Sequence, residues 1–547
     1  MQVTQSYARP STAHHHNDGM QFNFAAETHR NPVNLNALIK NSLQYARIML
    51  ALRLVVKGDW RTPRPDHTAY QDWVVERYWE ELPQNLKGID PEKIKLLQKR
   101  EKLKQSQKQI QRIINPIQSQ INKAQREYFK WLYQHDREKW IVLDPVISVH
   151  PDAVIFEAFS LDESTYGRVS IPSHMLETFG KTDYGTTNID FSQILADELY
   201  RVRSYRPAWL KVAFEKVEIG TYLNTAIEKK IDLPESWVKG FLQVQSAATL
   251  EGKTITLSTS TIADVLAILD RKREKQSPRS LKFILKKGQP IQIQIDPWGI
   301  IINDTHHYEG KEDTEVKIWG RRRLEVLKDL LPYSDKIWVK LLGTGMPSYW
   351  TIIAGEHRFD LGLSGWTDND WAKKASFDLL ASSGTTEKVD LTQVKNILIQ
   401  KLAISPEEVS QSLKISRNAA TKALQELCKQ GQAMYDHLTE QYRWRQLLQQ
   451  DIQLSPNTEE DERIRYAISL NKENKVLITE KNNIDAQLTQ YKATVKGKND
   501  YSIALQLDLD GRVKLAQCTC SFYRRNKLRQ GPCQHIIATL LMITKNA

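Results

Sequence analysis

The sequence predicts a multidomain α+β protein with a helical N-terminal region, a mixed α/β middle region, a module of three helices and a hairpin, and a C-terminal β-hairpin followed by a helix. The chain has 547 residues, which is too long for a single hydrophobic core. Blocks of helical and strand-like hydrophobic periodicity follow one another along it. Three of its four cysteines fall within one short C-terminal stretch.

Composition and charge bound the class of protein. Apolar residues make up 40% of the chain and charged residues 26%, as in ordinary globular proteins. The formal net charge of +12 favours polyanionic partners, nucleic acid first among them. The clustered cysteines indicate a reducing compartment. The N-terminus lacks an apolar signal core, and the apolar segment 46–56 is interrupted by Arg47 and Arg53. We therefore expect a cytoplasmic protein with no membrane partner.

The N-terminal part contains two kinds of segment. Residues 1–33 are rich in Ser, Asn, Gln and His, and we expect a disordered arm. The run His14–His16 within it is interpreted as incidental or as an expression tag, with weak metal binding as the alternative.

Residues 34–140 follow a helical pattern. Within 92–131, apolar residues form a narrow stripe at helical spacing, and Pro116 must kink or split it. A helical hairpin or short coiled coil fits this pattern. Its lysines are interpreted as a solvated face, with nucleic-acid contact as the alternative.

Residues 141–380 mix strands and helices. Residues 151–156 read as a turn followed by a buried strand, and residues 291–295 alternate as a strand does. Aromatic residues are dense in 318–371, where Arg321, Arg322 and Arg323 lie among them. Such a block forms either a core with arginines at its rim or a platform that stacks bases, and the first is the preferred interpretation.

The sequence contains no catalytic motif. The triplets at 180–182 and 252–254 read Gly-Lys-Thr, but Met175 and Ala247 stand where a phosphate-binding loop requires glycine. Cys428 lies on the apolar side of a predicted helix and is interpreted as a core residue. We therefore expect a protein that is not an enzyme.

Residues 386–450 show an ordered series of elements. A helix over 391–403 is followed by Ser405-Pro406-Glu407-Glu408, which caps a short second helix ending near Leu413. Ser416 can cap a third helix over 417–430, and two short strands follow it. Three helices and a hairpin in this order resemble a winged helix-turn-helix.

The resemblance implies that the third helix enters the major groove of DNA and that the wing contacts its backbone. Arg417, Asn418, Lys422 and Gln425 on the third helix suit phosphates and base edges. Arg443 and Arg445 occupy the predicted wing. The alternative is a winged helix that binds protein, which the modest charge of the third helix keeps open.

Residues 460–547 contain the most specific pattern of the chain. Apolar and polar residues alternate over 503–509 and again over 513–515, and Asp510-Gly511 is a preferred hairpin turn between them. The second strand runs into Cys518-Thr519-Cys520, whose two thiols face the same side. Cys533 and His535 then open an apolar helix. Three thiolates and an imidazole form a closed tetrahedral shell, which predicts one structural Zn²⁺.

The arrangement Cys-x-Cys followed by Cys-x-His, with a hairpin before it and a helix after it, resembles the SWIM zinc finger. The glycine- and tryptophan-rich segments within 318–371 are also similar to a segment of large bacterial SWIM proteins. The resemblance implies a DNA- or protein-interaction module.

The loop between the two ligand pairs contains Arg524, Arg525, Lys527 and Arg529, and no acidic residue occurs from Gly511 to the C-terminus. This loop suits phosphate binding, although a solvated loop is the alternative. The sequence as a whole predicts a zinc protein that binds DNA through a winged helix and a SWIM finger. The alternative is a scaffold that recruits other proteins through the same modules.

Overall fold

The computed structural model describes most of the chain outside residues 59–144. The described ranges are 5–7, 12–16, 19–25, 33–58, 145–188, 193–205, 207–213, 227–229, 235–272, 279–365, 370–371, 376–380, 387–447, 458–497 and 499–546. The chain divides into two compact units, residues 61–142 and the remainder. All described elements belong to the larger unit, residues 1–60 and 143–547. The helical hairpin predicted within 92–131 lies outside the described residues.

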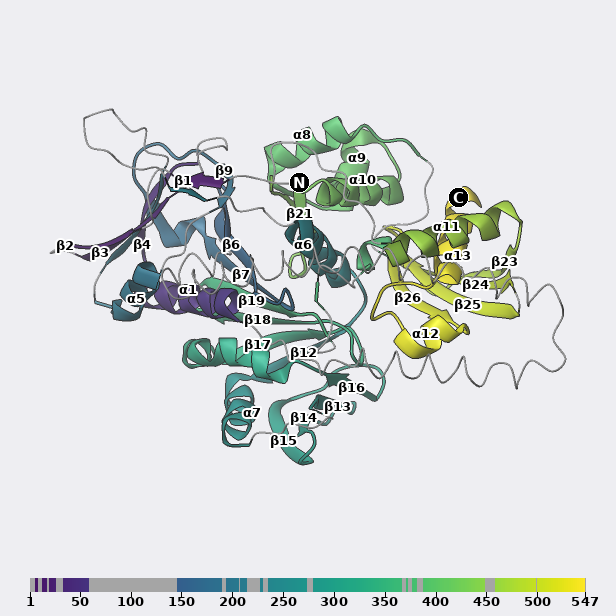
Figure 1. Ribbon diagram of the computed structural model, residues 1–547, viewed down its shortest axis with the longest axis horizontal. Coiled ribbons are helices and arrows are strands. Elements are labelled where there is room, and N and C mark those ends of the chain that lie inside the picture. The colour runs from purple at the N-terminus through teal and green to yellow at the C-terminus, as the bar shows by residue number, and fades with distance from the viewer. Residues whose placement is uncertain are drawn as a thin grey trace, which may run out of the picture. The chain divides into compact units, whose positions relative to one another are not determined.

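An eight-stranded antiparallel sheet is the largest sheet of the described residues (Figure 1). Its strands are ordered β12-β17-β18-β19-β7-β6-β5-β9. Their bounds are β5 Val146–Val149, β6 Ala153–Phe159, β7 Thr165–Pro172, β9 Gly185–Asn188, β12 Lys253–Ser258, β17 Lys336–Leu341, β18 Ser348–Ala354 and β19 His357–Leu363. Side chains on both sides of its central strands are buried, so both faces of the sheet are covered.

Helix α1 (Ser42–Lys57) packs tightly on one face of this sheet. A Cβ atom on Gly167 of β7 would lie 3.0 Å from a methyl carbon of Val55, so the absence of a side chain there admits the helix. The helix α6 (Glu235–Ala248) packs Phe241 against Phe159 of β6, with ring centroids 4.8 Å apart. The remaining helices of this region are η1 Ser173–Met175, α5 Gln193–Arg201, α7 Thr259–Arg271, η2 Arg321–Tyr333 and η3 Phe377–Leu379.

Three smaller sheets are built from residues 5–318 of the same unit. A five-stranded sheet has the order β2-β3-β10-β4-β8, a four-stranded sheet has the order β15-β14-β13-β16, and β1 pairs with β11. Their bounds are β1 Gln5–Tyr7, β2 Thr12–His16, β3 Gly19–Ala25, β4 Leu35–Ile39, β8 Leu176–Thr178, β10 Ala208–Ala213, β11 Ile227–Lys229, β13 Leu281–Leu285, β14 Pro290–Ile295, β15 Ile300–His307 and β16 Thr314–Ile318.

The N-terminal segment differs from the expected disordered arm. Strands β1, β2 and β3 lie within residues 1–33, and His14–His16 belong to β2. Strand β4 also lies in the region expected to be helical. Both β3 and β4 pair with β10, which is distant in sequence, so local composition gave no sign of these two pairings.

Residues 387–447, called here the three-helix module, combine helices α8, α9 and α10 with a small sheet ordered β20-β22-β21. Their bounds are α8 Leu391–Lys401, β20 Ala403–Ile404, α9 Pro406–Leu413, α10 Arg417–Lys429, β21 Ala433–Asp436 and β22 Gln441–Trp444. The capping residues act as the sequence indicates. Ser405 forms a capping box with Glu408, and the Ser416 hydroxyl accepts a hydrogen bond from the backbone of Ala419.

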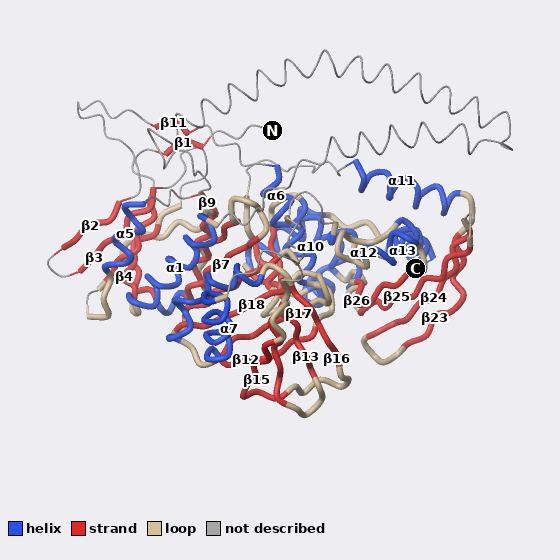
Figure 2. The backbone as a smooth tube through the Cα atoms, turned by 60° about the horizontal axis from the view of Figure 1, so that its bottom comes forward, coloured by secondary structure: helices blue, strands red, loops and turns tan. Residues whose placement is uncertain are grey.

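The C-terminal residues 458–546 form a four-stranded antiparallel sheet in sequence order, with helix α13 against one face (Figure 2). Its elements are α11 Thr458–Lys472, β23 Val476–Asn483, β24 Leu488–Lys496, β25 Asp500–Asp508, β26 Val513–Cys518, α12 Ser521–Asn526 and α13 Gln534–Asn546. The predicted hairpin corresponds to β25 and β26. None of the described helices is both long and apolar enough to cross a membrane.

Candidate metal centre and basic surfaces

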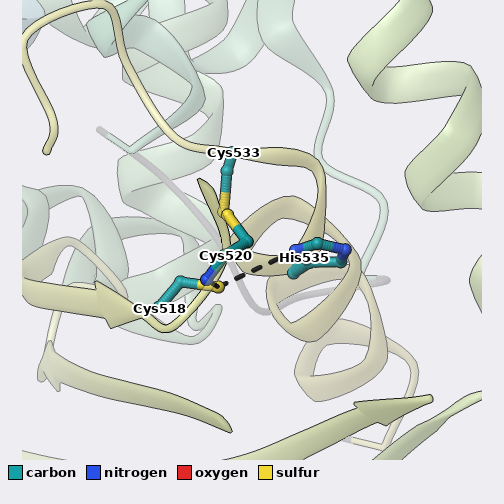
Figure 3. A group of neighbouring side chains, drawn as sticks. All are labelled: Cys518, Cys520, Cys533 and His535. Carbon is teal, nitrogen blue, oxygen red and sulfur yellow. Dashed lines mark hydrogen bonds between the residues drawn. The ribbon is translucent and has the colours of Figure 1, made fainter. Parts of the chain in front are cut away.

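Four side chains meet where β26, α12 and α13 come together (Figure 3). Cys518 is the last residue of β26, and Cys520 is the N-cap of α12. Cys533 directly precedes α13, and His535 is its second residue. The hairpin register pairs Cys518 with Ile503 of β25, so the buried face of the strand carries the first thiol to the base of α13.

The geometry of this cluster suits one metal ion. The four ligand atoms all lie within 4.8 Å of one another, and every one of the four residues is buried. The Cys518 sulfur lies 3.7 Å from Nδ1 of His535. Tetrahedral zinc with Zn–S bonds of about 2.3 Å separates neighbouring ligand atoms by about 3.8 Å. The donor set is therefore the right size for Zn²⁺ and has the thiolate and imidazole chemistry that zinc favours.

Hydrogen bonds from the backbone reach two of the ligand sulfurs. The backbone N–H of Tyr523 donates to the Cys520 sulfur at 3.4 Å, and that of Cys520 donates to the Cys518 sulfur at 3.5 Å. Hydrogen bonds from the Cys518 and Cys533 thiols hold the pKa of Cys520 far below its usual range, whereas the same hydrogen bonds raise the pKa of Cys518 and Cys533. One of the three thiols therefore favours the thiolate, and metal binding must release the protons of the other two.

Two supporting residues had no signal in the sequence. The ring of Tyr501 stacks on His535 with centroids 4.2 Å apart and an interplanar angle of 20°. Arg463 of α11 donates to the backbone carbonyls of Gln530 at 3.2 Å and Pro532 at 2.8 Å. The stacking fixes the imidazole plane, and the arginine fixes the loop that enters the second ligand pair. Contacts of this kind, made by groups next to the ligands, keep metal ligands in position.

Comparison with known proteins identifies this region. Residues 502–543 match the SWIM zinc finger family. The match contains all four ligands, so the SWIM resemblance is confirmed for this segment. A search of curated proteins found no match.

Similar solved structures include chains of PCNA. A chain of the PCNA2–PCNA3 complex of Sulfolobus tokodaii has 13% identity and a TM-score of 0.29, and the alignment covers 44% of this chain and 95% of that one. A chain from the complex of A. fulgidus PCNA with the C-terminal region of FEN-1 has 15% identity and a TM-score of 0.29, with 42% and 91% covered. These TM-scores are too low to indicate a shared fold.

The loop between the two ligand pairs, residues 521–532, is called here the zinc loop. Its cations lie mostly at the surface. Arg524, Arg525 and Lys527 are exposed on or just after α12, whereas Arg529 is half-buried. The Lys527 ammonium lies over the Tyr523 ring at 5.1 Å. Burial lowers the pKa of Arg529. The first three cations are therefore accessible to a polyanion.

The predicted contacts on α10 are less accessible. Gln425 is 1% exposed and donates to the Tyr442 hydroxyl at 2.8 Å, so its amide belongs to the core of the three-helix module. Asn418 is half-buried, and Arg417 is held in ion pairs. Only Lys422 is exposed among these four. Helix α10 was expected to present a whole polar face, but other elements cover most of it.

The predicted wing arginines are not at the surface. Arg445 is 1% exposed and donates from Nη1 to both carboxylate oxygens of Glu157, at 2.9 and 3.0 Å. Arg443 is also buried and pairs with Asp152. Both partners lie on or beside β6 of the eight-stranded sheet. In this structure the two arginines join the hairpin to the sheet, and their contact with nucleic acid stays a prediction.

Asp436 at the end of β21 adds to the same contact. It accepts from Arg168 of β7 at 2.8 Å and from Arg358 of β19 at 3.0 Å. Burial alone would raise the pKa of Asp436, but the two guanidinium groups hold it well below its usual range. The hairpin β21–β22 is thus docked on the sheet through buried, paired charges.

Proposed function

We propose that this chain is a zinc-stabilised DNA-binding protein whose principal contact surface is the basic loop of its SWIM finger. The observation that carries the proposal is the exposure of Arg524, Arg525 and Lys527 between the two ligand pairs. The chain from Gly511 to the C-terminus contains no acidic residue that could neutralise them locally. Exposed cations on a fixed scaffold bind phosphates without reading sequence.

The metal has a structural role in this proposal. Cys518, Cys520, Cys533 and His535 hold one Zn²⁺ in a closed shell, which leaves no position for a water or a substrate. The shell joins the end of β26 to the starts of α12 and α13, and so fixes the loop that carries the cations. We assign no catalytic activity to the chain, and we place it in the cytoplasm.

The three-helix module is assigned as a winged helix with a reduced role in binding. Its order of helix, strand, two helices and hairpin supports this assignment. Lys422 offers a second contact to the DNA backbone. Asn418 adds to this contact once it is uncovered, and Arg417 adds to it once it leaves its ion pairs. Direct readout of bases by Gln425 is not part of the proposal, because that side chain is buried.

A protein scaffold is the second candidate. The ion pairs of Arg443 and Arg445 with Asp152 and Glu157 favour it. A predicted wing that is held on a sheet by such pairs positions a module and does not contact DNA. The two candidates differ in their response to salt. Phosphate contacts make binding weaken steeply as salt rises, whereas most protein contacts are less sensitive.

Titration of a labelled random-sequence duplex at several salt concentrations tests the proposal. The wild-type chain is compared with a loop variant, Arg524→Ala/Arg525→Ala/Lys527→Ala. Loss of three phosphate contacts should weaken binding to every sequence and flatten the logarithmic salt slope by about 2.7.

The matched control removes the same charge from another part of the finger, with Lys481→Ala/Lys492→Ala/Lys496→Ala on β23 and β24. This control should bind nearly as the wild type does. An equal loss in both triple variants would show that net charge alone matters. No binding by the wild type at low salt would end the DNA proposal in favour of the scaffold.

A further inference from the structure

The turn between β25 and β26 reaches from the SWIM finger to the three-helix module. Gly511 has a positive φ of 72°, as a tight Asp-Gly turn requires. The Asp508 carboxylate accepts backbone hydrogen bonds from Asp510 at 3.0 Å and Arg512 at 2.9 Å. The turn is therefore internally braced and presents its side chains in fixed positions.

Contacts on either side of Asp510 anchor the turn. Arg512 is 4% exposed, and its guanidinium lies 5.3 Å from the ring centroid of Tyr435 and 5.7 Å from that of Tyr442. The backbone N–H of Val513 donates to the carbonyl of Leu380 at 3.1 Å. The turn of the finger thus contacts the β21–β22 hairpin and Leu380, at the same place where it meets α10.

Asp510 meets α10 at its first residue. Its Oδ1 atom accepts from Nε of Arg417 at 2.8 Å, and the carboxylate is nearly buried, with 10% of its side chain exposed. Glu407 of α9 takes the other side of the same guanidinium at 3.3 Å. A third carboxylate, that of Glu387, accepts from the hydroxyl of Ser416 at 2.7 Å.

These carboxylates occupy the place where a helix would receive a phosphate. The N-terminus of a helix attracts anions, and an arginine there is a common phosphate ligand. In this chain the positive end of α10 and Arg417 already face acidic groups, one of them supplied by the finger. An incoming phosphate would have to displace the Asp510 carboxylate and would meet repulsion from Glu407.

We propose that Asp510 is an autoinhibitory latch, an internal phosphate mimic that closes the N-terminus of α10 to DNA. This inference rests on the proposed DNA-binding function. With the latch closed, the zinc loop binds DNA without help from Arg417. With the latch open, Arg417 adds a further phosphate contact and α10 joins the interface.

The latch is tested with Asp510→Asn in the full-length chain. Asn-Gly is a preferred hairpin turn, so the substitution keeps the turn and removes the charge. Affinity for a random duplex should rise by up to about fivefold, the range of a partly exposed ion pair. The logarithmic salt slope should become steeper by about 1, because one more phosphate is neutralised.

Two comparisons make the result specific. Glu480→Gln removes one negative charge from β23 of the same finger, and it should leave affinity nearly unchanged. In an Arg417→Ala background, Asp510→Asn should no longer raise affinity, because the released group is absent. Equal effects of Asp510→Asn and Glu480→Gln, or a gain that persists without Arg417, would overturn the latch.

Failure of the underlying function gives a different result. If the wild type and the Asp510→Asn variant both bind no DNA at low salt, the DNA-binding proposal and the latch fall together. If the zinc-loop variant loses affinity while Asp510→Asn behaves as the wild type, the DNA function stands and only the latch is refuted.

Discussion

Replacing Arg445 with methionine removes the most deeply buried charge that joins the three-helix module to the eight-stranded sheet. The side chains of Arg445 and Glu157 are each 1% exposed. After the substitution the Glu157 carboxylate keeps the Tyr166 hydroxyl, which donates to it at 2.7 Å, but loses the arginine with which it forms an ion pair. Leaving one partner of a buried pair uncompensated costs about 3–5 kcal/mol. Methionine fills much of the same volume, so the charge should account for most of this loss.

Urea denaturation, followed by the hydrogen exchange of β21 and β22, measures the effect. With a urea m-value of about 3 kcal/mol per molar, the midpoint should fall by roughly 1 M or more. The matched variant Glu157→Gln/Arg445→Met removes both charges and keeps an acceptor for Tyr166. It should recover most of the lost stability, because no unpaired charge remains. A single variant within about 1 kcal/mol of the wild type, or a double variant below the single one, would refute the argument.

Three further predictions concern metal, domain independence and pH. Purified wild-type protein should contain one zinc per chain, and Cys518→Ala/His535→Ala should lose it; metal analysis that finds equal zinc in both would contradict the ligand assignment. Chelation should expose β25, β26 and α13 to protease while residues 391–444 stay resistant, because metal binding contributes folding energy locally; cleavage that spreads equally into α8 and α10 would contradict this. Burial lowers the pKa of His150, His357 and His437 to about 4 each. Unfolding lets these groups take up protons between about pH 6.5 and pH 4, so the free energy of unfolding should decrease as the pH falls through this window, and His437→Gln should lose part of that dependence in urea titrations at about pH 7 and pH 5.

The zinc site could be predicted because its determinants are local. Strand alternation, the Asp510-Gly511 turn and the spacing of the ligands all lie within one short segment, and each specifies a backbone direction without reference to the rest of the chain. The helix caps at Ser405 and Ser416 could be predicted for the same reason. Where structure depends on residues a few positions apart, the sequence contains the whole argument.

The docking of the modules could not be predicted, because its partners are distant. Arg445 and Glu157 are separated by 288 positions, and Arg417 and Asp510 by 93. A helix pattern shows which face of α10 is polar, but it does not show that a sheet, a hairpin and a turn cover that face. Gln425 illustrates the difference: a residue predicted to lie on a polar face is a core residue, and its amide nitrogen donates to the Tyr442 hydroxyl.

Charge balance within a segment nevertheless indicates which cations remain available. Arg443 and Arg445 follow Asp436 and Glu440 in the same hairpin, so this segment contains charges of both signs. It packs on a sheet face that also has both, with Arg168 pairing Asp436 and Glu157 pairing Arg445. The chain after Gly511 has no carboxylate side chain of its own, so its cations can be paired only by other parts of the protein. Arg512 and Lys514 at the start of this segment are engaged by the docked turn, whereas Arg524, Arg525 and Lys527 lie beyond it and are exposed. If this reasoning holds, placing an acid inside the zinc loop, as in Asn526→Asp, should weaken DNA binding without releasing zinc, because it supplies the internal counter-charge that the loop lacks. Binding titrations and metal analysis on the same sample decide the point, and undiminished affinity would show that the loop is a solvated surface.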